Sequence, residues 1–458
     1  MRELRSKFSS FVLVISMICC MVTLSGFCLV PLASAEVFSL PCTITTTGNA
    51  WNGQLAFGLF QYNSSNSQQI DESYLVVMDT NGSVLHLLQS SGQQYFGAVK
   101  YIAQDTLMVQ GANSPTGSEL FFWNFTSNQT TYFPGIYGHH DVDYDPVNNT
   151  FLTLHNYVRN VNGTNYLFDT IVEVNATGSV LWSWDTYGHI PLSEADPFND
   201  TAVVNGQTVI DFTHSNAIEW DYKDNIIYLN VRHTNTFYKI DQNTGNIVWA
   251  CGQFGNFTLI NSQGQQVSSL WYHSHDTHQI APDVFIMFDN DFHNETNPLD
   301  ARSRILEVTL NEKTMTAKET WSWESPPTDW SQYWGSADVL PNGDRIGVFG
   351  DPTHEFGQQG AQNTTGAVVV EVNQKGDVVR TYTFPAGWGI YRVTEIGSQS
   401  EQLATSGLPP PSQNTALVDV SFLAAAVAIA AIVAIVIIYL KRRTKIAFQG
   451  QINSDMRA

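Results

Sequence analysis

The chain has 458 residues, and its 42 acidic and 21 basic side chains give a formal net charge of −21. An acidic exterior repels phosphate backbones and anionic lipids, which excludes nucleic acid and acidic membrane surfaces as main partners. Outside the apolar N-terminal segment the only cysteines are Cys42 and Cys251. A disulfide scaffold is therefore excluded, and room is left for one disulfide.

The first 35 residues have the pattern of a signal peptide. Three basic residues precede an apolar run from about Phe11 to Leu32, and Ala33-Ser34-Ala35 forms a small-x-small cleavage site. We expect the mature chain to begin near Glu36. An uncleaved N-terminal anchor is the alternative, because the apolar run is long for a signal peptide.

Residues 36–396 have the pattern of an all-β domain. Short alternating apolar runs are separated by Gly, Asn and Asp, which is typical of strands and tight turns. One hairpin form, in which an apolar strand, a turn with Gly or Asn and a second strand follow one another, recurs six times. The six hairpins are Leu75–Leu85, Leu120–Tyr132, Ile171–Trp182, Tyr238–Trp249, Ile305–Trp321 and Val368–Val379.

Another pair of short strands accompanies each hairpin, so the repeating unit has four strands and about 60 residues. The first unit begins mid-way, near Leu55–Phe60, whereas Gly389–Ile396 adds one surplus strand at the end. A closed propeller joins its two ends in this way and hides its sheet edges. We therefore predict a six-bladed β-propeller over 36–396. A pair of β-sandwiches, the alternative, would not explain six similar hairpins.

The C-terminal 62 residues divide into three expected segments. Residues 397–417, rich in Ser, Gln and Pro, have the composition of a semi-rigid stalk. Residues 418–440 contain the charge-free apolar run Ser421–Leu440, which is long enough to cross a bilayer as one helix. Basic residues follow at once, so we expect 441–458 to be a cytoplasmic tail and the propeller to face outward from the cell membrane.

The expected ectodomain carries eleven Asn-x-Ser/Thr sequons, which on an exported chain predict a glycosylated surface. They lie at Asn63, Asn81, Asn124, Asn128, Asn148, Asn162, Asn175, Asn199, Asn256, Asn294 and Asn363.

Three of the twelve histidines recur at one place in the repeat. His140, His214 and His275 lie 14, 15 and 13 residues before the ends of the strands that finish at Leu154, Leu229 and Phe288. The first strand of each propeller blade lines the central channel. We therefore expect the three imidazoles to meet in one pocket. Six others are expected to be ordinary surface or hydrogen-bonded residues: His86, His155, His189, His233, His293 and His354.

Arg232 and Asn216 are the expected companions of these histidines. Arg232 follows the strand pair of its repeat, and Asn216 shares a strand face with His214. Imidazoles, a guanidinium and an amide, with few carboxylates, suit an oxyanion such as sulfate or phosphate. A metal site is the alternative, because His273-Ser-His275-Asp-Thr-His278 resembles the metal-binding motif of metallo-β-lactamase-like hydrolases and three imidazoles suit zinc.

Taken together, these segments resemble arylsulfotransferases of the bacterial type that do not use PAPS. The resemblance covers nearly the whole ectodomain and rests on the order and spacing of five segments. They are Gly138-His139-His140-Asp141, Thr213-His214-Ser215-Asn216-Ala217-Ile218, Val231-Arg232-His233, Ser274-His275-Asp276-Thr277 with Phe288-Asp289-Asn290, and Gly335–Gly343. The family fold is a six-bladed propeller, in agreement with the repeat count.

The resemblance implies transfer of a sulfuryl group from a phenolic sulfate ester to a phenol by a ping-pong route. His275 maps to the family's nucleophile, and His140, His214, Asn216 and Arg232 map to its other site residues. Ser274 and Thr277 depart from the usual Gln and Ala. No cofactor is implied, and the chain has no Walker-type loop for a nucleotide donor. The alternatives are a non-catalytic surface propeller that binds glycans or a protein, and a histidine–metal hydrolase.

Overall fold

The computed structural model describes residues 38–63, 66–90, 95–112, 120–195, 200–291, 293, 301–350 and 365–397. The predicted signal peptide (1–35), transmembrane helix (418–440) and tail (441–458) lie outside these residues, as does the predicted stalk (397–417) beyond its first residue. Within the described part of the chain, no helix is long and apolar enough to span a membrane.

The described residues form six sheets. Five of them contain four antiparallel strands that are consecutive in the chain, and the first contains three consecutive strands plus the last described strand. The strands of the first three sheets are β29 (Trp388–Ile396), β2 (Gln54–Asn63), β3 (Asn66–Asp79) and β4 (Val84–Gln89); β5 (Tyr95–Ala103), β6 (Thr106–Ala112), β7 (Leu120–Asn124) and β8 (Gln129–Phe133); and β9 (Val142–Asp145), β10 (Thr150–Val161), β11 (Thr164–Asn175) and β12 (Val180–Asp185).

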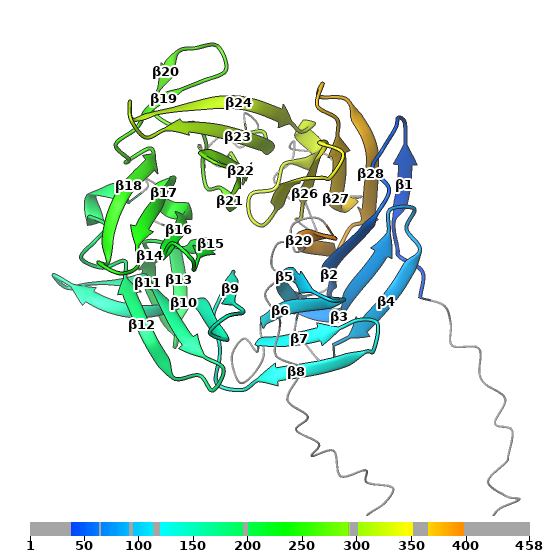
Figure 1. Ribbon diagram of the computed structural model, residues 1–458, viewed down its shortest axis with the longest axis horizontal. Helices are drawn as coiled ribbons and strands as arrows, with labels where there is room; N and C mark the ends of the chain where they lie inside the picture. The colour runs from blue at the N-terminus through cyan, green and yellow to red at the C-terminus, as the bar shows by residue number, and fades with distance from the viewer. Residues whose placement is uncertain are drawn as a thin grey trace, which may run out of the picture. The chain divides into compact units, whose positions relative to one another are not determined.

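The other three sheets have the same plan. Their strands are β15 (Ser215–Asp221), β16 (Ile226–Val231), β17 (Thr236–Asp241) and β18 (Asn246–Gly252); β21 (His275–Ala281), β22 (Val284–Asp289), β23 (Arg304–Asn311) and β24 (Thr316–Glu324); and β25 (Ser336–Val339), β26 (Arg345–Phe349), β27 (Thr365–Val372) and β28 (Val378–Pro385). Figure 1 shows the sheets arranged around a common centre, with the first strand of each nearest to it. The fold is thus all-β and propeller-like.

The two ends of the domain meet in one sheet, as the sequence predicts. β29 pairs with β2 in antiparallel register, for example Ile390 with Leu59 and Thr394 with Ala56. The inner strand of the first sheet therefore comes from the end of the domain. This pairing gives β2 a partner along an edge that would otherwise be open.

The hairpin formed by the third and fourth strands of each sheet is the clearest repeat in the sequence, and the residues of its turn explain why. In three of the six hairpins the turn opens on Asp79, Asn175 or Asn373, and the side-chain Oδ1 of that residue accepts two backbone N–H groups. The glycine three residues later has a φ between 80° and 90° in each case. Only glycine adopts that conformation without strain, so these hairpins share a recognisable pattern.

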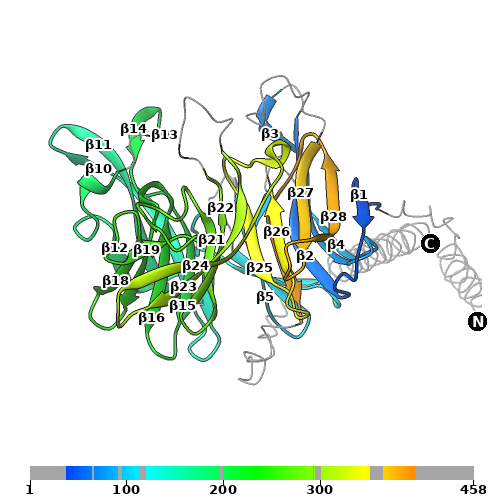
Figure 2. The same cartoon turned by 90° about the horizontal axis from the view of Figure 1, so that it is seen from above.

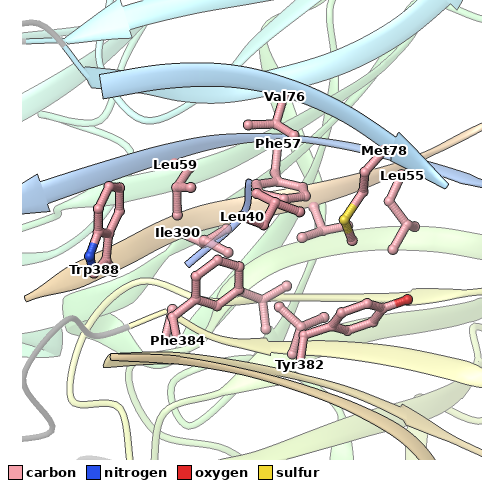
Figure 3. Close-up of a cluster of buried hydrophobic side chains, with 14 of the residues drawn as sticks. Leu40, Leu55, Phe57, Leu59, Val76, Met78, Tyr382, Phe384, Trp388 and Ile390 are labelled. Carbon is pink, nitrogen blue, oxygen red and sulfur yellow. The ribbon is translucent and has the colours of Figure 1, made fainter. Parts of the chain in front are cut away.

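The hydrophobic core lies between neighbouring sheets rather than in one central mass. One cluster joins the first and last sheets, where Phe57 and Leu59 of β2 pack with Tyr382 and Phe384 of β28. Figure 3 shows these side chains facing one another, with Ile390 of β29 between them. One equivalent cluster joins the first and second sheets, another joins the fourth and fifth, and a third joins the fifth and sixth.

Carboxylates on the inner strands also link one sheet to the next. Glu219 of β15 accepts the backbone N–H of Gln279 in β21 at 2.7 Å. Asp276 of β21 accepts the N–H of Ala337 in β25 at 3.3 Å. Because each acceptor sits on the strand nearest the centre, the inner strands hold a fixed position relative to their neighbours.

Several elements were not predicted. β1 (Thr43–Thr46) adds to the outer edge of β28, and two small hairpins extend other sheets: β13 (Thr201–Val204) with β14 (Gln207–Asp211), and β19 (Thr258–Ile260) with β20 (Gln266–Val267). Figure 2 shows the β13–β14 hairpin beside the ends of β10 and β11, with which it shares a sheet. Three short 3₁₀ turns complete the described elements: η2 (Leu192–Glu194), η3 (Arg232–Thr234) and η5 (Pro327–Asp329).

The structure locates the two cysteines and most of the sequon asparagines. Cys42 and Cys251 are both free, so the single disulfide for which the sequence left room does not form. The sequon asparagines whose side chains are described are all exposed or half-buried. They are Asn81, Asn124, Asn128, Asn148, Asn162, Asn175 and Asn256.

Candidate active site

Four turns that directly precede inner strands carry a residue with a left-handed backbone conformation. His140, His214, His273 and Trp334 each lie one or two residues before an inner strand, and each has a φ between 49° and 63°. This left-handed conformation is uncommon outside glycine, although histidine adopts it more readily than most residues. Three neighbouring sheets therefore each present a histidine from the same kind of strained turn.

His275 occupies a different place from the other two predicted histidines. It is the first residue of β21, two positions beyond the left-handed turn residue His273. The expectation that His140, His214 and His275 are equivalent by position is therefore wrong in detail, because His273 holds the equivalent turn position. The side chain of His275 is 1% exposed.

Asn290 fixes the tautomer of His275. The Asn290 side-chain nitrogen donates to two carbonyl oxygens, those of Ser331 and Trp334, at 2.8 Å each. Its Oδ1 must therefore accept from the Nδ1 of His275, which lies 2.7 Å away. The proton of neutral His275 is thus on Nδ1, and the lone pair is on Nε2.

The three predicted histidines form one cluster. The rings of His140 and His214 are 4.8 Å apart at their centroids. The ring of Tyr391 lies between those of His140 and His275, with its centroid 6.2 Å from that of His140 and 6.3 Å from that of His275. The structure thus brings the rings of His140 and His214 together and places His275 across Tyr391 from His140.

Burial and neighbouring positive charge keep these imidazoles neutral. Burial, followed by the charge of Arg232, lowers the pKa of His275 well below the ordinary value of 6.5. Burial and the adjacent His214 do the same to the pKa of His140. A neutral imidazole has a free nitrogen lone pair, so His275 has the electronic form that a nucleophile needs.

His214 differs because a carboxylate supports it. Its Nδ1 lies 2.6 Å from the Oδ2 of Asp211. Burial lowers the pKa of His214 and Asp211 raises it, with a net lowering. Although burial opposes ionisation of Asp211, His214 holds the pKa of that carboxyl at about 2. The positive charge of a protonated His214 is therefore partly balanced by the negative charge of Asp211. A protonated His275 would face the neutral amide of Asn290 instead.

A carboxylate also lies behind His140. The Nδ1 atoms of His139 and His140 are 2.6 Å apart, and the Nε2 of His139 is 3.1 Å from the Oδ1 of Asp169. Asp169 is buried, and it accepts hydrogen bonds from the Thr213 hydroxyl and the Ser215 N–H. These contacts through His139 and Asp169 link the turn that carries His140 to the turn that carries His214.

Arg232 reaches the same cluster from η3. Its backbone N–H bonds to the carbonyl oxygen of His214, and its side chain donates to the carbonyl oxygen of Gln332 at 3.3 Å. The guanidinium also lies 3.5 Å from Asp200 Oδ2 and beside the ring of His233. Only 6% of Arg232 is exposed, so its charge acts in a region where water screens it weakly.

The family model for arylsulfotransferase (ASST) matches residues 51–392 of this chain. The chain belongs to the arylsulfotransferase family. The match reaches into all six sheets and includes every residue of the cluster described above, and it ends at Arg392 of the closing strand β29. No protein among the curated sequences matches the chain.

Solved structures with a similar arrangement have low identity to this arylsulfotransferase-family chain. TolB from Acinetobacter baumannii has 9% identity and a TM-score of 0.42 over 75% of this chain and 66% of its own. The periplasmic gluconolactonase PpgL from Pseudomonas aeruginosa has 10% identity and a TM-score of 0.38 over 75% and 100%. The Cps50 (Swd1) β-propeller domain from Myceliophteria thermophila has 10% identity and a TM-score of 0.32 over 76% and 99%.

Asn216 is not positioned as a substrate ligand in this family member. It is fully buried, and its side-chain nitrogen donates to the carbonyl oxygen of Ser274 at 2.8 Å. Its Oδ1 accepts from Asn230 at 2.7 Å. Both polar atoms of the amide are thus used inside the protein. Asn216 holds the peptide that precedes His275 instead of facing the cluster.

Four site residues were missed by sequence reasoning. His233, expected to be ordinary, has its ring centroid 4.7 Å from that of His214. Asp211 precedes His214 by three residues, a spacing that on its own carries little information. Tyr391 and Arg392 lie on β29, and Arg392 is 4% exposed. The signal for Arg392 was available, because a charged residue within the apolar run Trp388–Val393 of the closing strand needs a buried partner.

The metal alternative is not supported by the residues that prompted it. His278 is held by the Asp276 carbonyl oxygen at 2.9 Å and by Asp338 at 3.4 Å. In the described ranges, one different group has metal-ligand spacing: Asp211, His214 and His233. The guanidinium of Arg232 lies against His233 Nε2, and its positive charge opposes a cation there.

Proposed function

We propose that this chain is an aryl sulfotransferase that moves a sulfuryl group from a phenolic sulfate ester to a phenol, with His275 as the covalent carrier. The observation that carries the proposal is the cluster of His275, His214, His140 and Arg232, in which Asn290 leaves Nε2 of His275 free. In this cluster His275 and Arg232 are buried, and His214 and His140 are half-buried. The family match supports the reaction class.

In the first half-reaction the Nε2 lone pair of His275 forms a bond to sulfur, and the bond between sulfur and the phenolic oxygen breaks. The oxygen leaves with the electron pair as a phenolate and takes a proton from an acid. His275 keeps its Nδ1 proton, so the sulfonated ring is positively charged and the sulfuryl oxygens carry the balancing negative charge. This charged ring remains a good leaving group for the second transfer.

His214 is the best-placed acid for the leaving phenolate. Its carboxylate partner Asp211, 2.6 Å away, stabilises the protonated ring. A bound sulfate ester adds a negative charge that further favours protonation. In the second half-reaction a new phenol gives its proton back to His214, its oxygen attacks sulfur, and the bond from sulfur to His275 breaks.

Arg232 supplies the positive charge that the transferred group requires. The sulfuryl oxygens carry negative charge throughout the transfer, and fixed donors in a buried site stabilise that charge strongly. Arg232 is charged at all relevant pH values and presents several donors in one plane. His140 stands beside His214 and serves as a further donor to these oxygens. The chemistry requires no cofactor.

Two further expectations belong to this proposal. We take the six sheets as the six blades of one closed propeller, a count supported by the pairing of β29 with β2. We also propose that the enzyme acts outside the cell as a single-pass membrane protein, which is supported by the sequence patterns of residues 1–35 and 418–440.

The test is transfer from nitrophenyl sulfate to a second phenol by the purified full-length chain. We expect sulfated acceptor and parallel-line, ping-pong kinetics. His275→Ala should abolish transfer, and His214→Gln should slow it by about 10²–10⁴-fold.

His189→Gln is the matched control, because His189 is exposed and stacks on Trp184 on the outer strand β12. It should transfer at the wild-type rate. The absence of sulfated acceptor with wild-type protein, or a His214→Gln variant as active as the His189→Gln variant, would contradict the proposal.

A further inference from the structure

We propose that Arg392 is a positioning residue that holds the three histidine-bearing segments in their reactive arrangement. The inference rests on the proposed sulfuryl transfer through His275, and it gives a role to a side chain that the transfer itself does not use. Arg392 lies on β29, the strand that closes the ring.

The Arg392 guanidinium has one partner beside each of the three histidines. Its Nη1 is 3.0 Å from Asp141 Oδ2, and Asp141 follows His140 directly. Its Nε is 3.2 Å from Asp276 Oδ1, and Asp276 follows His275 directly.

The third contact reaches the segment that carries His214. Nη2 of Arg392 donates to the backbone carbonyl oxygen of Asn216 at 2.6 Å, two residues after His214. One side chain thus bridges three consecutive sheets, through the turn before β9 and through β15 and β21.

The partners of Arg392 are themselves anchored, so the bridge is stiff. Asp141 also pairs with Lys100 of β5 at 3.1 Å and accepts the N–H of Ile218 at 2.9 Å. Asp276 accepts the N–H of Ala337. It has a left-handed φ of 56° at an irregularity of β21, where the strand loses register between His275 and His278. A displaced Asp276 would displace His275.

The shape of arginine matters as much as its charge. Three partners in three directions suit a planar group with five donors, whereas the compact ammonium group of lysine cannot reach all of them at once. Lysine at this position would keep the charge and lose the bridge. This difference separates the positioning effect from the electrostatic effect.

The charge of Arg392 has its own measurable consequence. Burial is the largest cause that lowers the pKa of both His275 and His140, and nearby cationic groups lower it further. Arg392 is one of these groups and makes a smaller contribution than the others. Removing the charge should therefore raise both pKa values, and the reaction needs neutral His275. The charged and titratable groups that face Arg392 and these two imidazoles are Lys100, Asp141, Asp276, Tyr391, His139, His214 and Arg232.

The experiment compares Arg392→Lys and Arg392→Met with wild-type full-length protein in the release of nitrophenol from nitrophenyl sulfate across pH. Both variants should lose about 10²-fold in kcat/KM, the usual effect of misplacing reacting groups by about 1 Å. The acid limb of the pH profile should move to higher pH in Arg392→Met and stay near the wild-type position in Arg392→Lys.

Arg380→Met is the matched control. Arg380 is equally buried, pairs with Glu371 at 3.6 Å and donates to the carbonyl oxygen of Trp51 at 2.8 Å, on the outer side of the last sheet. Its loss should lower the thermal unfolding midpoint and leave the position of the acid limb unchanged.

The outcomes separate this inference from the proposed function. Wild-type protein that releases no nitrophenol contradicts the proposed function. Active wild-type protein together with Arg392 variants that keep its kcat/KM and its acid limb overturns the positioning role. If neither Arg392 variant folds, Asp276→Asn, which removes one anchor of the bridge, takes their place. It must show the same fall in kcat/KM with a native thermal transition. Unchanged kcat/KM in Asp276→Asn overturns the inference.

Discussion

At the scale of single residues, the contact that decides the chemistry is between His275 and Asn290. A histidine nucleophile often has a carboxylate as its Nδ1 partner, but here the partner is an amide whose orientation is fixed by the carbonyl oxygens of Ser331 and Trp334. The amide holds the Nδ1 proton without adding negative charge. His275 therefore stays neutral while its tautomer is controlled.

Replacing Asn290 by aspartate tests this point. Wild-type His275 has a pKa well below 6.5, so nitrophenol release should continue as the pH falls through the ordinary histidine range. In Asn290→Asp the added carboxylate stabilises the protonated ring and should raise the pKa of His275. The acid limb should then move to higher pH, measured as kcat/KM from about pH 5 to about pH 8. An unmoved acid limb would mean that His275 is not the titrating base.

At the scale of elements, β21 combines the nucleophile with a charged group on the same strand. His278 lies between Glu219 and Asp338, and although burial opposes its protonation these carboxylates raise its pKa to about 10. The same surroundings, chiefly burial, raise the pKa of Glu219 to about 7. His278 thus carries a positive charge that helps to hold the inner strands β15, β21 and β25 together.

His278→Gln should destabilise the protein in a pH-dependent way. The folded pKa of His278 is raised above its unfolded value of 6.5, so its stabilisation is fully present below pH 6.5 and is lost as pH rises through about 10. The difference in free energy of unfolding between wild type and variant should therefore shrink from neutral pH toward pH 10. Urea unfolding at several pH values measures it.

A double-mutant cycle with Asp338→Asn provides the control for that measurement. His278 and Asp338 are 3.4 Å apart, so their substitutions should be non-additive near neutral pH, and this coupling should fall as pH rises through about 10. Additivity throughout would show that the pair does not interact.

At the scale of the whole molecule, the ring is closed by one strand that also serves the candidate site. Ile390 is fully buried in the cluster between the first and last sheets, and Tyr391 and Arg392 follow it toward the histidines. The pairing of β29 with β2 therefore both closes the ring and brings Tyr391 and Arg392 to the candidate site. A chain that failed to pair β29 with β2 would lose both.

Ile390→Ala should lower the free energy of unfolding by about 2–5 kcal/mol, because it leaves a cavity in the joint between the sheets. Val203→Ala on β13, where the side chain is 74% exposed, is the comparison and should change it by less than about 0.5 kcal/mol. Denaturant unfolding measures both. Equal, small effects would indicate that the joint is loosely packed.

The sequence predicts the ring well and the site only in part, for physical reasons. The hairpins were recognisable because turns that open on Asp79, Asn175 and Asn373 require a glycine at a fixed offset. The histidines were recognisable because they recur with the repeat. Asn216 was placed in the site although its amide is used to hold Ser274, since a strand face predicted from alternation does not reveal which partners a side chain finds.

Other contacts depend on residues far apart in the chain. Arg392 reaches Asp141 and Asp276 only because the last strand of the domain joins the first sheet. His273, and not His275, holds the position equivalent to His140 and His214, because strand irregularities shift the register by a residue or two. Spacing alone did not distinguish these two histidines.

The central claim is that His275 carries the sulfuryl group, and intact mass spectrometry tests it most directly. The purified full-length chain would be mixed briefly with nitrophenyl sulfate in the absence of acceptor, and the modified residue would be located by fragmentation. We predict a gain of one sulfuryl group on His275 that disappears when a phenol is added and never forms in His275→Ala. Release of nitrophenol without any gain in mass, or the same gain in His275→Ala, would contradict the claim.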